Sequence, residues 1–518
     1  MLIIEKIKLL NFKKFQEISL DFNQYFNILI GDNESGKSTV LLALDLVLSG
    51  SKNKIENIGL EFLFNNDSIK KYFSTNKHYS KLPELSVELF FNEQNNEDLN
   101  GKNNSEHKEC DGLKLVVKPD MEYINEIINI ISNTTNNFPF EFYKYEFSSF
   151  QGKPYTGYSK FVNHIFIDNS RIGSEYAMKE YVNNMYNSQI ESSDKFDYQN
   201  QYRKYKNEFN NKVLKCINDK TENYNFGVKN DSKSNLLTDL TIFEDDIPIE
   251  NKGKGKQCFV KTEFAIRKSK KNIDVILIEE PENHLSHSNM RSLINYISKT
   301  GGRQIFITTH NNLISSRLDL KNVILLSSTS DDYAKLNNLD NDTAKYFMKA
   351  SDHNILEFAL SKKVILVEGD AEYMLMDKMF ETVANKKHSE FEVSIIAIGG
   401  ISFKRYLNIA KILKIKTAII RDNDHDYINN CEDNYNEYCN DIIHVFADND
   451  NKIFTFEIAV YIENKELCDK LFTSPQRKLN IQEYMLSNKT EAAFALLESD
   501  EKLNVPGYIR KAIEWIKE

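Results

Sequence analysis

The sequence predicts an α/β protein built from two domains. Its 518 residues exceed what one ordinary hydrophobic core accommodates, so at least two domains are expected. A strand, a glycine-containing loop and a helix near the N-terminus form a phosphate-binding pattern, which predicts a nucleotide-binding domain there. After about residue 355 the alternation of apolar strands and helices begins anew, which predicts a parallel sheet. We therefore place the first domain at residues 1–355 and the second at residues 356–518.

The composition is typical of a folded cytoplasmic protein. Hydrophobic residues make up 41% and charged residues 27%, which argues against long disorder. No apolar run reaches the length of a membrane-spanning helix, and the start does not resemble a signal peptide. The 6 cysteines are scattered without a C-x-x-C pair, which suits reduced thiols and argues against structural zinc. The net charge of -10 counts against a generally basic nucleic-acid binder but is compatible with a local basic groove.

The first motif lies in "YFNILIGDNESGKSTVLLALDLVL". An apolar strand is predicted over Phe26–Ile30 and an amphipathic helix from about Ser38. The glycines between them let backbone N–H groups face phosphates, Lys37 can reach the β/γ oxygens, and Ser38 can bind Mg²⁺. A plain glycine turn is the alternative, and the strand and helix on either side weaken it. The predicted ATP-binding residues of this loop are Gly31, Asn33, Glu34, Ser35, Gly36, Lys37, Ser38 and Thr39.

Further residues of the nucleotide site are predicted far downstream. The apolar strand Val275–Ile278 ends in Glu279 and Glu280, and after a helix over about Ser286–Ile297 a second strand leads to His310. A carboxylate pair at a strand end can hold the water shell of a metal and orient an attacking water, and a histidine can sense the γ-phosphate. A charged loop and a surface histidine are the separate alternatives. Because Glu279, Glu280 and His310 follow a phosphate-binding loop in this order, we favour one nucleotide site whose residues come from distant parts of the chain.

These motifs, together with the opening "IKLLNFKKF", resemble the ABC-type ATPases of the SMC and RecF-like branch. The resemblance covers about residues 1–330, with a long insertion after Gly50. It implies that ATP lies between two subunits and that a signature loop from one subunit closes on the γ-phosphate of the other. The matching stretch is Glu250–Ile266, with Lys254 where the family has serine, followed by Gly255.

A second departure from this family is Glu279, expected to bind the magnesium of ATP, which stands where the family has aspartate. Both departures favour ATP binding as a clamp or switch over fast hydrolysis. In the insertion, "LPELSVELFFNE" and "LKLVVK" alternate like antiparallel strands, and Glu175–Ile217 has helical spacing. The resemblance implies a helical dimerisation element at about 172–225, and a surface helical hairpin without a partner is the equal alternative.

Acidic residues follow two predicted strands of the second domain. Val364–Val367 precedes Glu368, and Thr417–Ile420 precedes "RDNDHD", which contains Asp422 and Asp424. A helix from about Ala371, the strand in "FEVSIIAIGG" and a helix over Phe403–Leu413 complete the alternation. Because the carboxyl ends of parallel strands share one sheet edge, these acids are expected to converge there.

The acidic run could also be a calcium loop or a solvated acidic loop. A calcium loop requires glycine at its sixth position and glutamate at its twelfth, but Tyr427 and Asp433 stand there. A solvated acidic loop is the stronger alternative, and the matching Glu368 weakens it. Clustered carboxylates repel unless cations neutralise them, and oxygen-only ligands suit Mg²⁺ or Mn²⁺.

"VILVEGDAEY" followed by "RDND" resembles a TOPRIM domain, a Rossmann-like fold that holds divalent metal for phosphoryl transfer or hydrolysis. An ABC-type ATPase followed by TOPRIM resembles the overcoming-lysogenization-defect (OLD) family of nucleases, which includes Gabija-type and retron-associated antiphage effectors. This resemblance implies a catalytic Glu457 and Lys489, with Lys489 stabilising charge on the phosphate. The implied metal ligands are Glu368, Asp370, Glu372, Asp422, Asp424 and Glu457.

The expected function is an ATP-regulated, Mg²⁺- or Mn²⁺-dependent endonuclease or nickase that acts as at least a homodimer. DNA is the expected substrate and antiphage defence the setting that the resemblance implies, with a helicase or a retron reverse transcriptase as a conceivable partner. The alternatives are a TOPRIM nuclease for RNA such as tRNA and a non-nucleolytic repair ATPase. A topoisomerase or primase is a weaker alternative, because no region of the sequence is typical of a separate cleavage domain.

Overall fold

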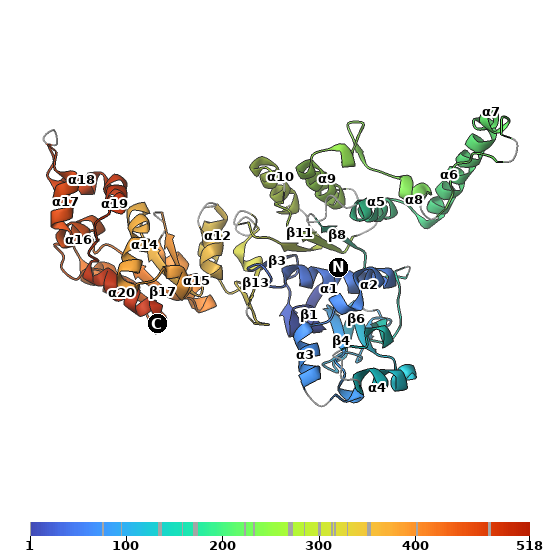
Figure 1. Ribbon diagram of the computed structural model, residues 1–518, viewed down its shortest axis with the longest axis horizontal. Helices are drawn as coiled ribbons and strands as arrows, with labels where there is room; N and C mark the ends of the chain where they lie inside the picture. The colour runs from blue at the N-terminus through green and yellow to red at the C-terminus, as the bar shows by residue number, and fades with distance from the viewer. Residues whose placement is uncertain are drawn as a thin grey trace. The chain divides into compact units, whose positions relative to one another are not determined.

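The structure is a computed structural model that divides into two compact units (Figure 1). The first unit comprises Met1–His310 with Leu326–Tyr333, and the second comprises Asn311–Leu325 with Ala334–Glu518. The predicted domain boundary near residue 355 stays a prediction. The residues described are 2–74, 77–94, 96–132, 137–157, 159–168, 175–221, 224–231, 234–267, 273–283, 285–298, 302–311, 314, 318–328, 330–349, 354–399, 402–474 and 478–518.

The first unit contains an antiparallel sheet with the order β2-β1-β4-β6 and β7 beside β6. Its strands alternate because one face covers a core: in β1, Ile4, Ile7 and Leu9 are buried while Glu5 and Leu10 are exposed. The predicted antiparallel strands of the insertion are β4 and β6. The strands are β1 (Ile4–Phe12), β2 (Phe15–Asp21), β4 (Leu85–Phe91), β6 (Cys110–Pro119) and β7 (Tyr143–Ser149).

Four strands of the second sheet, in the order β3-β12-β11-β8, run parallel to one another in this unit. These strands are apolar almost throughout because both faces are covered. The strands are β3 (Phe26–Ile30), β8 (His164–Asp168), β11 (Val275–Glu279) and β12 (Gln304–Thr308). Their parallel register brings the phosphate-binding loop, Glu280 and Thr309 to one edge, since each follows the carboxyl end of a strand.

Helix α1 (Lys37–Ser49) packs against strands of both sheets. Nearly every side chain from Thr39 onward is buried, which explains why its sequence is apolar on more than one side. It ends at Gly50, whose φ of 55° is the left-handed conformation typical of a helix C-terminus. The loop at its start and the residues at its end are therefore fixed to the same rigid element.

The remaining helices of the first unit begin with α2 (Lys52–Ile58), α3 (Asn66–Ser74) and α4 (Ile124–Ser132). The segment predicted as helical over Glu175–Ile217 consists of α5 (Glu175–Gln189), α6 (Ser192–Lys212) and α7 (Lys215–Asn218). The break falls where Ser192, Ser193 and Asp194 favour a helix start. The last helices are α8 (Leu236–Asp239), α9 (Lys254–Arg267) and α10 (His287–Ser298).

The second unit is a four-stranded parallel sheet with the order β16-β15-β17-β18. Helices α14 and α20 pack on the sheet, and α13 and α15 pack together against β16 and β17 (Figure 1). The strands are β15 (Lys363–Val367), β16 (Val393–Ala397), β17 (Lys416–Ile420) and β18 (Ile443–Phe446). The helices are α12 (Asn341–Lys349), α13 (Ile355–Leu360), α14 (Asp370–Ala384), α15 (Phe403–Leu413), α16 (Phe456–Glu463), α17 (Lys465–Phe472), α18 (Ile481–Ser487), α19 (Lys489–Glu498) and α20 (Gly507–Lys517).

The strand order creates a topological switch point at the carboxyl ends of β15 and β17. The chain adds β16 on one side of β15 and then returns to add β17 on the other side. Ligands of open α/β sheets bind at such a switch point. Glu368 follows β15 and Asp422 follows β17, so the topology itself brings the predicted acids together. The predicted α/β class is confirmed, and no helix in the described segments is long and apolar enough to cross a bilayer.

A candidate nucleotide pocket and a candidate metal centre

The phosphate-binding loop surrounds the ammonium group of Lys37. The Lys37 Nζ donates to the carbonyl oxygens of Gly31 at 2.8 Å and Asp32 at 2.9 Å, and lies 3.4 Å from Ser35 Oγ. Gly36 has a φ of 97°, and a Cβ there would approach the Phe15 ring to 2.3 Å. No side chain caps the start of α1, so its first N–H groups are available to an anion. Burial lowers the pKa of Lys37, and the Glu280 carboxylate opposes that shift.

An open cavity of about 470 Å³ lies over this loop and extends to Glu280 and His310. The Glu280 Oε1 lies 3.6 Å from His310 Nε2, and its Oε2 accepts from Asn283 Nδ2 at 2.7 Å. The structure thus brings most of the predicted ATP-site residues together. The cavity is lined by Lys13, Lys14, Asn33, Glu34, Gly36, Lys37, Ser38, Thr39, Glu280, His310 and Ser328.

Three predicted nucleotide-site residues lie elsewhere. Glu279 is buried as the last residue of β11 and does not line the cavity. Lys254 is exposed as the first residue of α9, and neither it nor Gly255 lines the cavity of its own chain.

Sequence reasoning missed Glu282, which organises the His310 side of the pocket. Its Oε1 accepts from Thr309 Oγ1 and from the backbone N–H of His310, both at 2.7 Å. Burial raises the pKa of Glu282, and its Oε2 is buried without a hydrogen-bond partner among the described residues. The only signal in the sequence is a third acid in "EEPENH", and the contacts depend on β11 and β12 lying side by side.

Asp422 is the centre of the acidic cluster in the second unit. Its backbone N–H donates to Glu368 Oε1 at 3.3 Å, which joins the ends of β15 and β17. Its Oδ1 accepts from the backbone N–H of Phe456 at 2.7 Å, which holds the start of α16 at the same edge. Glu457 follows on the first turn of α16 and is buried. Three predicted acids, distant in the sequence, are therefore adjacent in space.

Glu457 and Lys489 form an ion pair with a separation of 3.1 Å between Oε2 and Nζ. Burial disfavours the charged form of Lys489, but the nearby carboxylates, Glu457 first among them, more than offset this effect and the pKa of Lys489 is raised. Neither Glu457 oxygen has a hydrogen-bond partner of good geometry in the described part of the chain. A buried carboxylate oxygen without such a partner is one that a cation or a water would satisfy.

The clustered acids repel one another, and their pKa values rise. Burial, followed by the charges of Glu368, Glu372 and Glu457, raises the pKa of Asp422 to about 8. Burial raises the pKa of Glu372 to about 7, with further contributions from Glu457 and Glu368. Burial also raises the pKa of Glu368, and Arg421 opposes that shift. A divalent cation would favour the ionised form of every one of these groups.

Two residues of "RDND" that were not predicted fix the geometry of this loop. The buried Asn423 donates through Nδ2 to the carbonyl oxygens of Asp448, Asp450 and Ile453 at 2.8, 3.1 and 3.1 Å. Arg421 donates from Nη2 to Asp424 Oδ2 at 3.1 Å, and its Nε lies 3.9 Å from Glu368 Oε1.

The donor set of this cluster fits Mg²⁺ or Mn²⁺ by chemistry, since it consists of carboxylate oxygens. In the described segments, however, no three His, Cys, Asp or Glu side chains already form a group that would hold one ion. Asp424 is largely exposed and engaged by Arg421, and Asp370 is exposed at the start of α14. The structure therefore places Glu368, Glu372, Asp422 and Glu457 at the cluster, Asp424 at its rim and Asp370 outside its described contacts.

Two family models match different parts of this chain. A family model described as AAA ATPase domain matches residues 2–314, and one described as overcoming lysogenization defect protein-like TOPRIM domain matches residues 360–424. The Old nuclease of Escherichia phage P2 is 22% identical over 271 residues, which are 48% of this chain and 46% of that protein. A structural maintenance of chromosomes protein 3 homolog of Plasmodium falciparum is 32% identical over 110 residues, which are 18% of this chain and 9% of that protein. The chain thus spans less than half the length of either relative.

Among solved structures, the SmcHead bound to the C-winged helix domain of ScpA aligns with a TM-score of 0.37 and 15% identity, over 65% of this chain and 99% of that one. RecF-ATP aligns with a TM-score of 0.36 and 12% identity, over 64% of this chain and 99% of that one. The C-terminal region of the Burkholderia pseudomallei OLD protein aligns with a TM-score of 0.24 and 22% identity, over 30% of this chain and 97% of that one.

The class of protein is an AAA ATPase domain, to whose family the chain belongs through residues 2–314, followed by a TOPRIM domain. That TOPRIM domain, residues 360–424, matches the OLD-like family model, and the P2 Old nuclease is a distant homologue.

Replacing Lys37 by Ala is expected to weaken ATP binding by about 10- to 100-fold, because a charge-assisted hydrogen bond to phosphate contributes roughly 1.5–3 kcal/mol. Isothermal titration calorimetry with ATP and Mg²⁺ measures the change. Lys70→Ala, which alters an exposed lysine that pairs with Asp67 on α3, is the matched control. Equal affinity of Lys37→Ala and the parent would remove the ATP-site assignment.

The raised pKa of Asp422 predicts a pH-dependent stability. An unfolded aspartate titrates near 3.9, so between about pH 4 and 8 the folded state binds a proton that the unfolded state releases, and the free energy of unfolding falls as pH rises. Asp422→Asn keeps an oxygen that accepts from Phe456 and removes this penalty. Between pH 5 and pH 8, without metal, the variant should gain at least about 1.4 kcal/mol over the parent, the equivalent of one pKa unit. Urea unfolding measures this, with Asp426→Asn as the control, and a pH-independent difference would contradict it.

Proposed function

We propose that this protein is an ATP-controlled nuclease that depends on a divalent metal and hydrolyses phosphodiester bonds. The observation that carries the proposal is the cluster of Glu368, Glu372, Asp422 and Glu457 at the switch point of the second sheet, with Lys489 beside it. Burying several carboxylates at one sheet edge lowers stability, and the raised pKa values of Glu368, Glu372 and Asp422 are typical of functional centres.

The residues of the cluster would have different roles in hydrolysis. The carboxylates of Asp422, Glu368 and Glu457 would hold Mg²⁺ or Mn²⁺, which when bound polarises the phosphate and lowers the pKa of an attacking water. The Lys489 ammonium, already 3.1 Å from Glu457, is positioned to neutralise charge that develops on the phosphate oxygens. Asn423 keeps the intervening loop in place and is a positioning residue.

The ATPase unit would control this reaction as a dimer. The exposed Lys254 lies outside its own nucleotide cavity, which supports its action on ATP bound to a second copy. Helix α6 exposes large aromatic side chains, including Phe196 at 69% and Tyr205 at 65%, which supports a contact with another chain. Glu279 in place of aspartate and Lys254 in place of serine favour ATP as a switch over rapid turnover.

DNA is the substrate we propose, on the strength of the distant similarity to the P2 Old nuclease, and antiphage defence is the setting. No membrane is required for either. An RNA substrate such as tRNA is an outcome that the same assay distinguishes.

Asp422→Asn should lose at least about 100-fold of the metal-dependent cleavage rate, because it removes the charge of the central carboxylate among the proposed metal ligands. The assay uses plasmid, single-stranded DNA and tRNA, each with Mg²⁺ or Mn²⁺ and with or without ATP. Asp426→Asn, in the same loop but with a carboxylate that accepts hydrogen bonds from Asn429, should cut like the parent.

Undiminished cleavage by Asp422→Asn on every substrate would refute the nuclease site. Cleavage of tRNA alone would assign the enzyme to RNA. A parent that cuts none of the substrates under any of these conditions, yet binds ATP, would favour a non-nucleolytic ATPase.

A further inference from the structure

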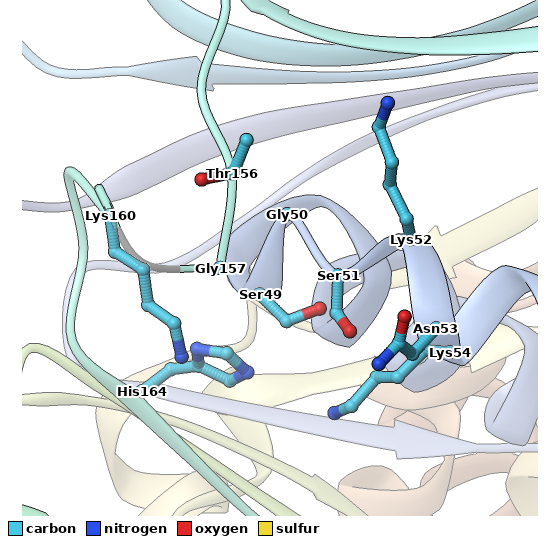
Figure 2. Close-up of a pocket in the computed structure, with 10 residues that line it drawn as sticks. All are labelled: Ser49, Gly50, Ser51, Lys52, Asn53, Lys54, Thr156, Gly157, Lys160 and His164. Carbon is cyan, nitrogen blue, oxygen red and sulfur yellow. The ribbon is translucent and has the colours of Figure 1, made fainter.

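A second cavity of the ATPase unit lies at the end of α1 opposite to the phosphate-binding loop. Its volume is about 420 Å³, within the range of small-ligand sites. Figure 2 shows the polar side chains that line it, which come from the turn between α1 and α2 and from the segment that leads into β8. They are Ser49, Ser51, Lys52, Lys54, Lys160 and His164.

The walls of this cavity are fixed by close backbone approaches. A Cβ on Gly50 would lie 2.8 Å from the Tyr155 ring, and a Cβ on Gly157 would lie 3.4 Å from the Ser49 carbonyl oxygen. The Tyr155 hydroxyl donates to the Val47 carbonyl at 2.7 Å, so the segment before β8 is anchored on α1. The cavity is therefore part of the packed structure of the unit.

Three lysines line this cavity, and one of them contacts a buried acid. That acid is Asp45, with Lys54 Nζ at 2.8 and 2.9 Å from its two oxygens and His164 Nε2 at 2.8 Å. Although burial opposes ionisation, Lys54 and His164 hold the pKa of Asp45 well below its usual range. One lysine thus offsets the carboxylate, and Lys52 and Lys160 add further positive charge to the wall.

The side chains are arranged around the cavity so that an anion would meet several donors. In Figure 2, Lys54 and Lys160 reach inward from opposite sides, the hydroxyl groups of Ser49 and Ser51 lie between them, and Lys52 extends away. The Ser49 hydroxyl donates to the Leu46 carbonyl at 3.1 Å, so the donors left for a ligand are the two ammonium groups and the Ser51 hydroxyl. Such donors around one space are a typical setting for phosphate oxygens.

His164 supplies an independent sign of a ligand. Burial lowers the pKa of His164, so its ring is neutral near pH 7, and Nε2 must carry the proton that it donates to Asp45. The buried Nδ1 is then an acceptor, and it has no hydrogen-bond partner among the described residues. A buried polar atom without a partner is unfavourable by about 1–3 kcal/mol, which a hydroxyl or a proton brought by a ligand would offset.

We propose that this cavity is a second anion site that binds a phosphate group, separate from the ATP pocket. Lys160 and Lys54 hold the phosphate oxygens, Ser51 donates to them, and His164 Nδ1 accepts a hydrogen bond from a hydroxyl of the ligand or from an accompanying water. The phosphate belongs either to a free small molecule or to a nucleic-acid backbone that passes over the cavity.

The test is carried out on the full chain carrying Lys37→Ala, which weakens phosphate binding at the ATP pocket. Inorganic phosphate and a short single-stranded DNA oligonucleotide are titrated separately by calorimetry in EDTA. Lys160→Ala should weaken binding of at least one probe by at least about tenfold. Lys153→Ala, which alters a half-exposed lysine paired with Asp98 near the same segment, should change neither.

Ser51→Asp provides a second variant if Lys160→Ala unfolds. Ser51 is the N-cap of α2, where Asp is equally favourable, so the substitution keeps the fold and introduces a repelling carboxylate. Loss of phosphate binding assigns a free anion as the ligand, and loss for the oligonucleotide alone assigns a nucleic-acid backbone. The proposal is overturned if the Lys37→Ala parent binds neither probe, or if Lys160→Ala and Ser51→Asp bind both as tightly as that parent. None of these binding results tests the proposed nuclease activity, which is tested by the cleavage assay with Asp422→Asn.

Discussion

The geometry of the second unit depends on the buried carboxylate of Asp422. The backbone N–H of Asp422 donates to Glu368 at the end of β15. The Oδ1 atom of Asp422 accepts from the backbone N–H of Phe456 in the first turn of α16. The second hydrogen bond thereby positions the turn that carries Glu457, whose helix also packs in the core of this unit. Burial and the neighbouring carboxylates disfavour the ionised form of Asp422, as its raised pKa indicates. A cation is what would favour that ionised form, which is the basis of the metal centre proposed above.

The ATPase unit has a comparable design. The Lys37 ammonium is held by carbonyl oxygens of its own loop, so phosphate oxygens can replace those partners without moving the lysine far. Helix α1 carries this loop at one end and the basic cavity at the other, and it packs against both sheets between them. The phosphate-binding loop and the proposed second anion site are thus attached to one helix.

Much of this architecture could be predicted because it follows from local pattern. The apolar runs at Phe26–Ile30, Val364–Val367 and Thr417–Ile420 end in loops whose residues carry the chemistry, and the rule for parallel sheets brings those ends together. Glu457 and Lys489 required family resemblance, because nothing near them in the sequence marks a sheet edge. Strand β18 was not predicted, since a four-residue strand gives little periodicity.

The residues that were missed act through tertiary contacts. Glu282 is an acid in a loop, and Asn423 is an amide in another. Only the folded chain shows which backbone groups their side chains bind. The cavity at Lys160 combines segments about one hundred residues apart, each of them unremarkable in sequence. Asp370 stays a predicted ligand, and it is exposed at the start of α14.

The central claim is that the acids around Asp422 capture a divalent cation. Electron paramagnetic resonance of Mn²⁺ titrated into the ATP-free protein measures this directly. The account predicts that the parent and Asp426→Asn bind Mn²⁺ alike, and that Asp422→Asn and Glu368→Gln each lose at least about tenfold in affinity. Equal Mn²⁺ affinity in all four proteins would contradict it.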